Sequence, residues 1–403
     1  MNSVGVNIAV KEGNKSAIDA ERHSDVHESL KAKDRSGPLR VLMAAGGTGG
    51  HIFPALAVAE ELVARAGKDE HEDVIRSIVF IGTNRGLESR LIPAAGYELR
   101  TVAAAGLKGI GGWKRITNLL VLPRSAFQAA KVLRSFRPDV VVGVGGYLAG
   151  PVMLEAALAN IPTLLIEPNA VPGFTNRVLA SVVRAAAVGF GATAGFYGSR
   201  ARVTGHAVRK AFYDIPPKTH ATPFTVLIIG GSQGSRAMNE CVVKSLELLS
   251  NEAWKLNVVH QTGERDYNVV RDAYRERSVS AEVFAFIEDM PQAFVRADLV
   301  ISRAGATSVA ELAAAGRAAV LIPFPGATDQ HQLENARVLE RAGAACLIEQ
   351  SALTPERLAA QVRELFGSPS RLVQMEERAK GLARPGAAKQ IADWVVELGK
   401  KKA

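Results

Sequence analysis

Apolar runs alternate with amphipathic stretches along the chain from residue 40 onward. The runs are short and rich in Val, Ile and Leu, which predicts buried strands, while the helical spacing of apolar positions between them predicts helices. In the first half, the expected strands are 40–45, 77–82, 139–143, 162–166 and 185–189. In the second half, they are 225–229, 256–260, 282–286, 298–302, 318–322 and 345–348. Strands that alternate with helices predict an α/β fold with doubly wound, mostly parallel sheets.

Breaks in this alternation predict how the chain is divided. Residues 1–38 are polar and mixed in charge, so we expect a disordered extension without a signal peptide. Segment 210–223 contains three prolines and predicts a linker between a first Rossmann-like domain, 39–209, and a second, 224–384. Residues 385–403 have the periodicity of an amphipathic helix, which by itself leaves open on which domain the helix packs.

Composition narrows the class of protein. The 403 residues suffice for two domains, and 47% hydrophobic with 22% charged residues is typical of a soluble globular chain. The two cysteines, Cys241 and Cys346, form no CxxC or Cys/His cluster, so we expect reduced thiols in a cytoplasmic protein. The net charge of +9 is compatible with nucleic acid, an anionic membrane surface or a phosphorylated substrate. No apolar run reaches the length of a transmembrane helix.

Two glycine-rich loops, GGTGGH (46–51) and GGSQGS (230–235), each follow an expected strand and precede an expected helix. In that arrangement, backbone N–H groups and the positive end of the helix dipole face the loop, which suits a phosphate. Neither loop matches GxGxxG or GxxxxGK[ST], which argues against a dinucleotide dehydrogenase and a P-loop NTPase. The glycines could simply permit tight turns, but two equivalent loops favour contacts with phosphate or hydroxyl groups.

The second loop also matches GxSxG, the nucleophile elbow of α/β-hydrolases. Ser232 would be the nucleophile, with Asp298 or Asp329 and then His331 following in the order of a catalytic triad. This alternative leaves the first domain without a role and lacks an HGGG-type oxyanion motif, so it is the less favoured interpretation.

Two further residues, His51 and Glu311, have the chemistry of a catalytic or nucleotide-binding site. His51 lies near the start of a helix whose dipole disfavours the imidazolium, so a neutral imidazole could accept a proton there. Glu311 lies in the first turns of another expected helix and could accept hydrogen bonds from two ribose hydroxyls. The structural alternatives are a loop-shaping histidine and a helix-capping acid. The polar run 323–336 suits a hydroxyl-rich sugar, and its single His and Asp are too few for a metal site.

The segment 101–138 contains no acidic residue and mixes basic with aliphatic and aromatic side chains. This mixture predicts peripheral contact with an anionic membrane surface, although the charges could also simply face water. Few aromatic side chains are available for base stacking, so we do not expect nucleic acid as a partner. The predicted membrane patch consists of Lys108, Trp113, Lys114, Arg115, Leu119, Leu120, Arg124, Phe127 and Lys131.

Seven segments, spread over roughly residues 40–400, resemble one family in order and spacing. They are GGTGGHIFPALAVA, GTNRGLESRLIP, PDVVVGVGGYLAGP, GGSQGSRAMN, FIEDM, SRAGATSVAELAAAG and DQHQLENA. Together they resemble the bacterial peptidoglycan N-acetylglucosaminyltransferases of glycosyltransferase family 28. The resemblance implies a GT-B fold, in which two Rossmann-like domains face a cleft and the C-terminal helix crosses back to the first domain.

The resemblance also implies an activity. It implies inverting transfer of GlcNAc from UDP-GlcNAc to the C4 hydroxyl of MurNAc in undecaprenyl-pyrophosphoryl-MurNAc-pentapeptide (lipid I), which gives lipid II for peptidoglycan, cell shape and division. The implied partners are UDP-GlcNAc, lipid I, an anionic membrane and cell-wall or division proteins. The implied location is the cytoplasmic face of the inner membrane, without an obligatory metal or other cofactor. Another GT-B enzyme acting on UDP-GlcNAc, such as an epimerase, is the alternative.

Site residues follow from the same resemblance. Glu311 is implied at the ribose, the backbone of Ile287 at the uracil, Gln332 at the GlcNAc hydroxyls and Tyr147 on the acceptor side. Inversion requires in-line attack with a base opposite the leaving UDP, and we predict that His51 is this base. The full set of implied donor-binding residues is Thr48, Gly49, Gly50, Asn169, Arg209, Ser232, Ile287, Ala306, Thr307, Ser308, Val309, Ala310, Glu311 and Gln332.

Two short stretches depart from the family pattern. The family usually has GNPVR where this chain has Gly205, His206, Ala207, Val208 and Arg209. It usually has EQN where this chain has EPN at 167–169. We therefore expect the Arg209 side chain to point in a different direction than in the family. We also expect the loop around Asn169 to be stiffer.

Overall fold

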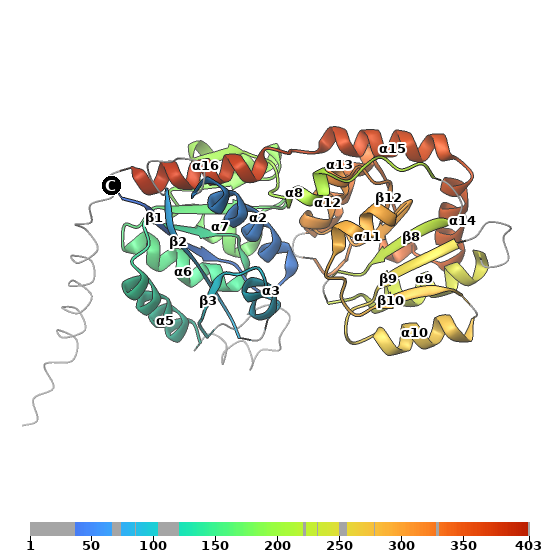
Figure 1. Cartoon of the computed structure of the whole chain (residues 1–403), viewed down its shortest axis with the longest axis horizontal. Helices are drawn as coiled ribbons and strands as arrows, with labels where there is room; N and C mark the ends of the chain where they lie inside the picture. Colours follow the sequence, from blue (N-terminus) through green and yellow to red (C-terminus); the bar gives the residue numbers. More distant parts are fainter. Residues whose placement is uncertain are drawn as a thin grey trace, which may run out of the picture.

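The computed structural model contains two α/β domains that lie side by side (Figure 1). It describes residues 37–66, 74–84, 86–103, 121–220, 223–231, 233–249, 256–277, 279–327 and 330–401. Each domain is built around one parallel sheet, whose strands are joined through helices that cover both faces. The α/β class and the two parallel sheets expected from the sequence are confirmed.

The sheet of the first domain has the order β3-β2-β1-β4-β5-β6-β7, and all its neighbouring strands are parallel. The strands are β1 (Leu39–Ala44), β2 (Ile75–Gly82), β3 (Glu98–Thr101), β4 (Val140–Gly143), β5 (Thr163–Glu167), β6 (Ala185–Val188) and β7 (Ala201–Val203). The edge strands β3 and β7 are absent from the expected set. Their sequences, ELRT and ARV, contain no buried apolar run because an edge strand is only partly covered.

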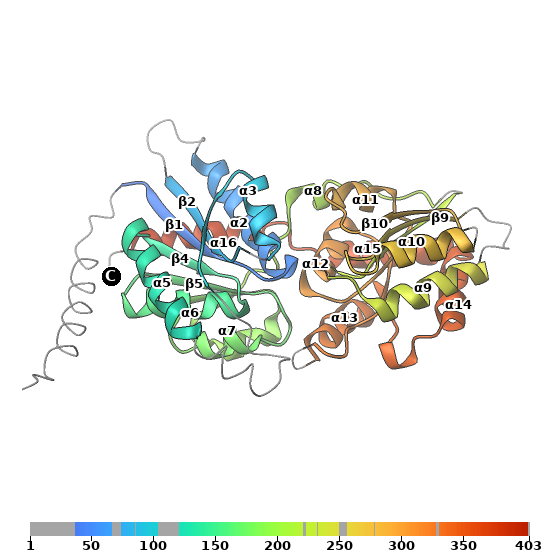
Figure 2. The ribbon, with the colours of Figure 1, turned by 90° about the horizontal axis from the view of Figure 1, so that it is seen from below.

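Helices cover this sheet in two layers. They are α2 (Gly49–Ala66), α3 (Glu88–Ala94), α5 (Val121–Phe136), α6 (Gly146–Leu158) and α7 (Phe174–Leu179), with 3₁₀ turns at Gly191–Phe196 and Gly198–Arg200. One core joins α2 and the C-terminal helix to the sheet, and a second core joins α5, α6 and α7 to its opposite face. Figure 2 shows α5, α6 and α7 together on that side.

The second sheet has the order β10-β9-β8-β11-β12-β13 and is also parallel throughout. Its strands are β8 (Phe224–Ile229), β9 (Leu256–Gln261), β10 (Ala281–Phe284), β11 (Leu299–Ser302), β12 (Ala319–Leu321) and β13 (Ala345–Leu347). The surrounding helices are α8 (Lys210–Tyr213), α9 (Arg236–Leu249), α10 (Tyr267–Glu276), α11 (Met290–Arg296), α12 (Ala306–Ala315), α13 (His331–Arg341), α14 (Pro355–Phe366) and α15 (Pro369–Leu382), with a 3₁₀ turn at Gln350–Ala352.

The C-terminal helix α16 (Ala387–Lys400) leaves α15 of the second domain and packs on the first (Figure 1). Its buried side chains, including Ile391 and Val395, share one core with α2 and β1. Arg202 stacks over the Trp394 ring at 4.2 Å, and Arg65 pairs with Asp393 at 2.8 Å. The helix therefore completes the first domain, so the two domains are connected by two chain crossings.

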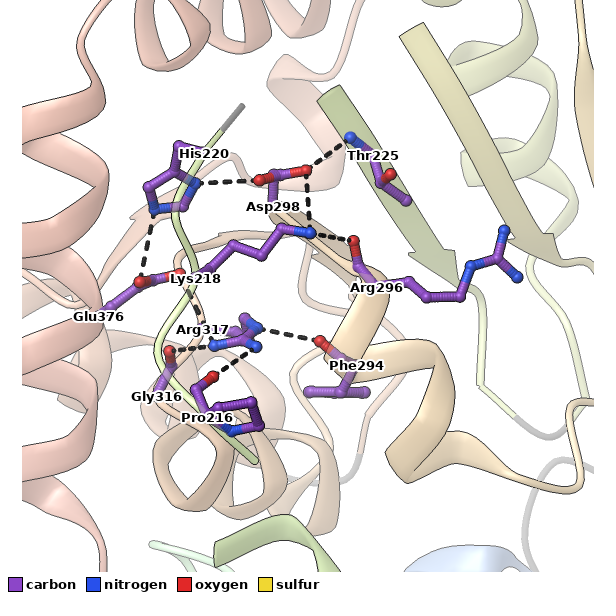
Figure 3. A network of polar contacts seen from close by, with 10 residues as sticks. All are labelled: Pro216, Lys218, His220, Thr225, Phe294, Arg296, Asp298, Gly316, Arg317 and Glu376. Carbon is purple, nitrogen blue, oxygen red and sulfur yellow. Dashed lines mark hydrogen bonds and ion pairs between the residues drawn. The ribbon is translucent and has the colours of Figure 1, made fainter. Parts of the chain in front are cut away.

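The proline-rich segment after α8 is anchored on the second domain by a network of charged groups (Figure 3). His220 lies between Asp298 and Glu376, with N···O distances of 3.2 and 3.4 Å. Burial alone would lower the pKa of His220, but hydrogen bonds to the two carboxylates raise it to about 9, so the imidazolium persists at neutral pH. Arg317 donates to the Pro216 carbonyl at 3.0 Å. Residues 216–220 are thus fixed to the second domain.

Candidate active site

A cleft of about 2130 Å³ lies between the two domains. One wall holds the first glycine loop and the starts of α2 and α6, and the other holds the second glycine loop and the starts of α12 and α13. These segments follow the carboxyl ends of the parallel strands, where open α/β sheets bind ligands.

The fully buried carboxylate of Glu88 anchors the first glycine loop. The Glu88 carboxylate accepts hydrogen bonds from the Gly47 amide at 3.0 Å, the Thr83 amide at 3.1 Å and the Thr83 hydroxyl at 2.6 Å. A Cβ on Gly86 would lie 2.0 Å from Glu88 Oε2, so the GTNRGLE motif needs glycine there. The motif thereby fixes the loop that lines the cleft through Thr48, Gly49 and Gly50, a role that sequence reasoning did not assign.

His51 lines the cleft in the first turn of α2. Burial lowers the pKa of its imidazole; the backbone of Gly46 opposes this effect, and His331 on the opposite wall adds to it. The imidazole is therefore neutral near pH 7 and can accept a proton. Tyr147, at the start of α6, lines the cleft next to the same loop: a Cβ on Gly47 would lie 3.8 Å from its Cε1 atom.

The two walls touch through Thr307 at the start of α12. Its hydroxyl donates to the Gly50 carbonyl at 3.2 Å and lies 3.2 Å from His206 Nε2. Since that hydroxyl proton goes to Gly50, the His206 Nε2–H donates to the Thr307 oxygen. Burial lowers the pKa of His206 to about 4, so this histidine is neutral. The departure from GNPVR thus provides a neutral contact between the domains.

A second buried carboxylate, Glu167, organises the loop after β5. It accepts from the amide and side chain of Asn169 at 2.9 and 3.0 Å, from the Gly173 amide at 3.0 Å and from Asn176 Nδ2 at 2.8 Å. Asn335 of α13 accepts from the Ala170 amide at 3.0 Å, which ties this loop to the other domain. Burial raises the pKa of Glu167 despite these hydrogen bonds.

Arg209 and Glu311 pair across the base of the cleft, with 3.6 Å between Nη2 and Oε1. The Arg209 guanidinium also stacks on Phe53 at 4.6 Å and on Phe212 at 5.1 Å, which fixes its direction. Burial raises the pKa of Glu311 to about 7, while Arg209 acts in the opposite direction. Glu311 is thus a carboxyl group that changes protonation near neutral pH.

Arg303, which follows β11, is a buried cation in the wall of the cleft. It donates to the carbonyls of Ile322 and Pro323 at 3.0 and 3.1 Å, to Gln350 Oε1 at 2.6 Å and to the Ser235 hydroxyl. Burial lowers its pKa to about 10, so it remains charged. These four partners are neutral, and among the residues that the structure describes no carboxylate pairs with Arg303, so its positive charge is available to a bound anion. Sequence reasoning missed this residue, although the SRAG motif contains it.

Family models match both domains. A model described as the glycosyltransferase family 28 N-terminal domain matches residues 41–188, and one described as the C-terminal domain of the same family matches residues 225–391.

The chain belongs to glycosyltransferase family 28.

Curated relatives agree with this assignment. The chain is 45% identical over 363 residues to the UDP-N-acetylglucosamine–N-acetylmuramyl-(pentapeptide) pyrophosphoryl-undecaprenol N-acetylglucosamine transferase of Myxococcus xanthus, covering 89% of this chain and 93% of that one. It is 45% identical over 369 residues to the protein of the same name from an Anaeromyxobacter species, covering 90% and 94%.

Solved structures agree with the fold. The Acinetobacter baumannii MurG crystal structure matches with a TM-score of 0.67 and 33% identity, covering 89% of this chain and all of that one. A UDP-GlcNAc 2-epimerase from Neisseria meningitidis matches with a TM-score of 0.63 but only 15% identity, which is a likeness of fold alone. Two Rossmann-like domains facing a cleft, the GT-B arrangement, are therefore the fold of this glycosyltransferase.

The cleft of the family 28 chain brings together most of the predicted donor-binding residues. Ile287 lines it, but its amide donates to Gln261 Oε1 at 2.8 Å, so uracil could use that amide only if Gln261 moves. Gln332 lines it and accepts from the Phe324 amide at 2.9 Å. Ser232 lies outside the described residues. The other predicted residues that line the cleft are Thr48, Gly49, Gly50, Asn169, Arg209, Ala306, Thr307, Ser308 and Glu311.

Two residues of the predicted donor-binding set, Val309 and Ala310 of α12, do not line the cleft. Val309 is buried in the core of the second domain, and the partly buried Ala310 packs against that core. The physical reason is the helical turn of about 100° per residue, which directs Thr307, Ser308 and Glu311 to one face of α12 and Val309 to the other.

A hydrolase triad through Asp298 is excluded by position. Asp298 precedes β11, at the amino end of the sheet, where it accepts from the Thr225 amide at 2.8 Å and pairs with His220. His331 lines the cleft near the carboxyl ends of the strands. The two side chains therefore belong to opposite ends of the domain. Asp329 lies outside the described residues.

The predicted membrane patch is only partly described. Arg124, Phe127 and Lys131 lie on α5 with exposed side chains, and Phe127 is 72% exposed. The remaining members, Lys108, Trp113, Lys114, Arg115, Leu119 and Leu120, lie outside the described residues. Within the described parts of the chain, no helix is both long and apolar enough to span a bilayer. In those same parts, no group of three or more His, Cys, Asp or Glu side chains is placed to hold a metal ion.

Loss of the Glu167 carboxylate should destabilise the first domain. Glu167→Ala leaves four donors without this acceptor, one of them buried and three half-buried. Each unsatisfied buried group costs roughly 1–3 kcal/mol, part of which water recovers. We expect the free energy of unfolding to fall by about 2–4 kcal/mol in urea denaturation. The exposed Glu377 of α15 is a matched control, and Glu377→Ala should change it by less than about 0.5 kcal/mol. Equal effects of the two substitutions would contradict the role of Glu167.

Proposed function

We propose that this family 28 enzyme transfers GlcNAc from UDP-GlcNAc to the C4 hydroxyl of MurNAc in lipid I, with inversion, and so forms lipid II for peptidoglycan. The observation that carries the proposal is the 45% identity over 89% of the chain to a relative named for this reaction. The cleft supports it, since it combines a neutral histidine, a carboxyl group and two arginines between two loops suited to phosphate.

In the proposed mechanism, the second domain holds the donor and the first domain holds the acceptor. Glu311 accepts the ribose hydroxyls, and Gln332 contacts the GlcNAc hydroxyls. His51, on the opposite wall, takes the proton from the attacking C4 hydroxyl as the new bond forms. The leaving UDP gains negative charge, and the amide of Ala306 at the start of α12, with Arg209 and Arg303, stabilises it. The residues act without a metal ion in this mechanism.

A transfer assay with labelled UDP-GlcNAc and a water-soluble lipid I analogue tests the proposal. We expect a labelled disaccharide product only when both substrates are present. Conversion of UDP-GlcNAc to its 2-epimer without acceptor would establish the epimerase alternative instead. Covalent labelling of the protein by a fluorophosphonate at Ser232 would establish the hydrolase.

We further propose that the enzyme is peripheral at the cytoplasmic face of the inner membrane, where lipid I and cell-wall or division proteins are its partners. The exposed Phe127 between Arg124 and Lys131 on α5 supports a membrane contact, because an apolar side chain flanked by cations suits an anionic leaflet.

Charge reversal on α5 should weaken membrane binding. Each cation near an anionic leaflet contributes about 1 kcal/mol, so Arg124→Glu with Lys131→Glu should lower binding to phosphatidylglycerol vesicles by at least tenfold in low salt. The measurement is vesicle cosedimentation. Lys244→Glu with Arg275→Glu, at exposed positions of the second domain, changes the net charge equally and should leave binding almost unaltered. Equal losses in both double variants would mean that only net charge matters.

A further inference from the structure

An apolar stripe leads out of the cleft along α6 and the α7 segment of the first domain. Its members recur at intervals of three or four residues on each segment, and all of them line the cleft. The two helices pack against each other in the same core, and Figure 2 shows them side by side. The apolar stripe consists of Tyr147, Pro151, Leu154, Phe174, Val178 and Val182.

The side chains of the apolar stripe are large and apolar. Such side chains are usually buried, but these are exposed to water. The exposed fraction is 63% for Phe174, 60% for Val178, 44% for Leu154 and 41% for Val182. Exposed apolar side chains that gather on one surface mark a binding site rather than chance exposure. The reaction cleft and this surface form one continuous hollow, so a ligand of the cleft can extend onto the stripe.

The apolar stripe begins at the reaction centre. Tyr147 lies beside Gly47 of the first glycine loop. Because this loop suits a phosphate and belongs to the domain proposed to hold the acceptor, we place the acceptor diphosphate there. From Tyr147 to Leu154, the last member of the stripe on α6, the helix rises about 10 Å. That length accommodates the first isoprene units in an extended conformation.

The low charge of this region favours a hydrocarbon chain, rather than an anionic membrane surface, as the occupant of the stripe. Residues 146–182 contain one cation, Arg177, and two carboxylates, of which Glu167 is fully buried. Helix α5, in contrast, carries Arg124, Lys131 and Arg134. Docking on an anionic leaflet favours a cationic face, whereas an uncharged chain favours a neutral apolar one. The stripe has the second character.

We propose that the apolar stripe binds the first isoprene units of the polyprenyl chain of the acceptor. This inference rests on the proposed function, in which that chain is joined directly to the acceptor diphosphate. With the diphosphate at the first glycine loop, the first units leave it next to Tyr147, and the stripe is the apolar surface that continues from that point. The stripe removes the hydrocarbon from water and thereby selects lipid-linked acceptors over soluble ones.

The test compares two water-soluble acceptors that share sugar, peptide and diphosphate. One carries a short isoprenoid chain and the other a methyl group. Val178→Asp places a charge in the stripe at an exposed position, and Val269→Asp does the same at a 69% exposed valine on α10. Val178→Asp should raise the KM for the isoprenoid acceptor by about tenfold or more and leave the KM for the methyl acceptor within about twofold. Val269→Asp should change neither value.

A second readout uses a short prenyl diphosphate that lacks the sugar. It should inhibit the wild-type enzyme competitively with the acceptor, and Val178→Asp should raise its inhibition constant by a factor similar to that seen for KM. Inorganic diphosphate should inhibit wild type and variant equally, because it does not reach the stripe.

Other occupants of the apolar stripe give different results, each of which overturns the proposal. Loss of vesicle binding by Val178→Asp with both KM values unchanged would assign the stripe to the bilayer surface. Loss of a dimer in gel filtration with unchanged KM values would assign it to a second copy of this chain. If wild type transfers GlcNAc to neither acceptor, the proposed function itself fails. If it transfers to both with equal KM, only the present inference fails.

Discussion

Replacement of His51 by alanine is expected to lower kcat by at least about 100-fold, because a positioned general base contributes roughly 10²–10⁴-fold. The affinity for UDP-GlcNAc should stay within about twofold, since the donor is proposed to bind on the opposite wall. The measurement is kcat with saturating donor and a soluble lipid I analogue, combined with calorimetric binding of UDP-GlcNAc. Burial lowers the pKa of His51 below its usual 6.5, so the acidic limb of the wild-type kcat profile should lie below pH 6.5.

Two controls separate catalysis by His51 from a structural role. Glutamine fills most of the same volume and forms hydrogen bonds but cannot act as a base, so His51→Gln should be as slow as His51→Ala. Near-normal turnover in His51→Gln would reduce His51 to a residue that shapes the glycine loop. Unfolding curves of both variants should match wild type, because a low rate in an unfolded protein carries no information about the base.

Sequence patterns predict the buried strands of this fold well, because a strand that is buried on both faces consists mainly of apolar residues. The central strands of both sheets are runs such as VVVG of β4 and FTVLII of β8, with every residue buried. The edge strands β3 and β7 lack such runs, and no local pattern marks them. The same limit applies to α12, where the motif indicated a contiguous binding stretch but the helical turn directs Val309 into the core.

The residues that support the site were harder to predict than those that line it. Glycine loops, His51 and Glu311 follow from local context, since each needs only a strand end or a helix start. Glu88 depends instead on a donor brought to it by the fold, the Gly47 amide, which is 41 positions away in sequence. The donors to Glu167 lie within nine positions of it, but they converge through a loop that has no regular periodicity. Buried charged residues inside a recurring motif are the signal that could have identified them.

Replacement of Glu311 by alanine is expected to weaken UDP-GlcNAc binding by about 10–100-fold, because hydrogen bonds to a charged group contribute about 1.5–3 kcal/mol. The substitution removes the ribose acceptor and also leaves Arg209 without its partner at 3.6 Å. Glu311→Gln retains the shape and a hydrogen-bond acceptor, so it should lose less affinity than alanine. An unaltered dissociation constant in both variants would remove Glu311 from the donor site.

The pH dependence of donor binding gives a sharper test, because the pKa of Glu311 is raised from 4.5 to about 7. If the ribose requires the carboxylate, affinity for UDP-GlcNAc should fall about tenfold between pH 8 and pH 6 as Glu311 takes up a proton, and binding should release protons. The diphosphate of UDP-GlcNAc is a diester that does not titrate in this range.

The contribution of Glu311 to folding stability has the opposite pH dependence. A carboxyl group with a raised folded pKa favours the fold at low pH, and this contribution is lost as pH rises from 4.5 through 7. Weaker binding at pH 6 therefore cannot result from Glu311-driven unfolding, and Glu311→Gln should abolish both trends.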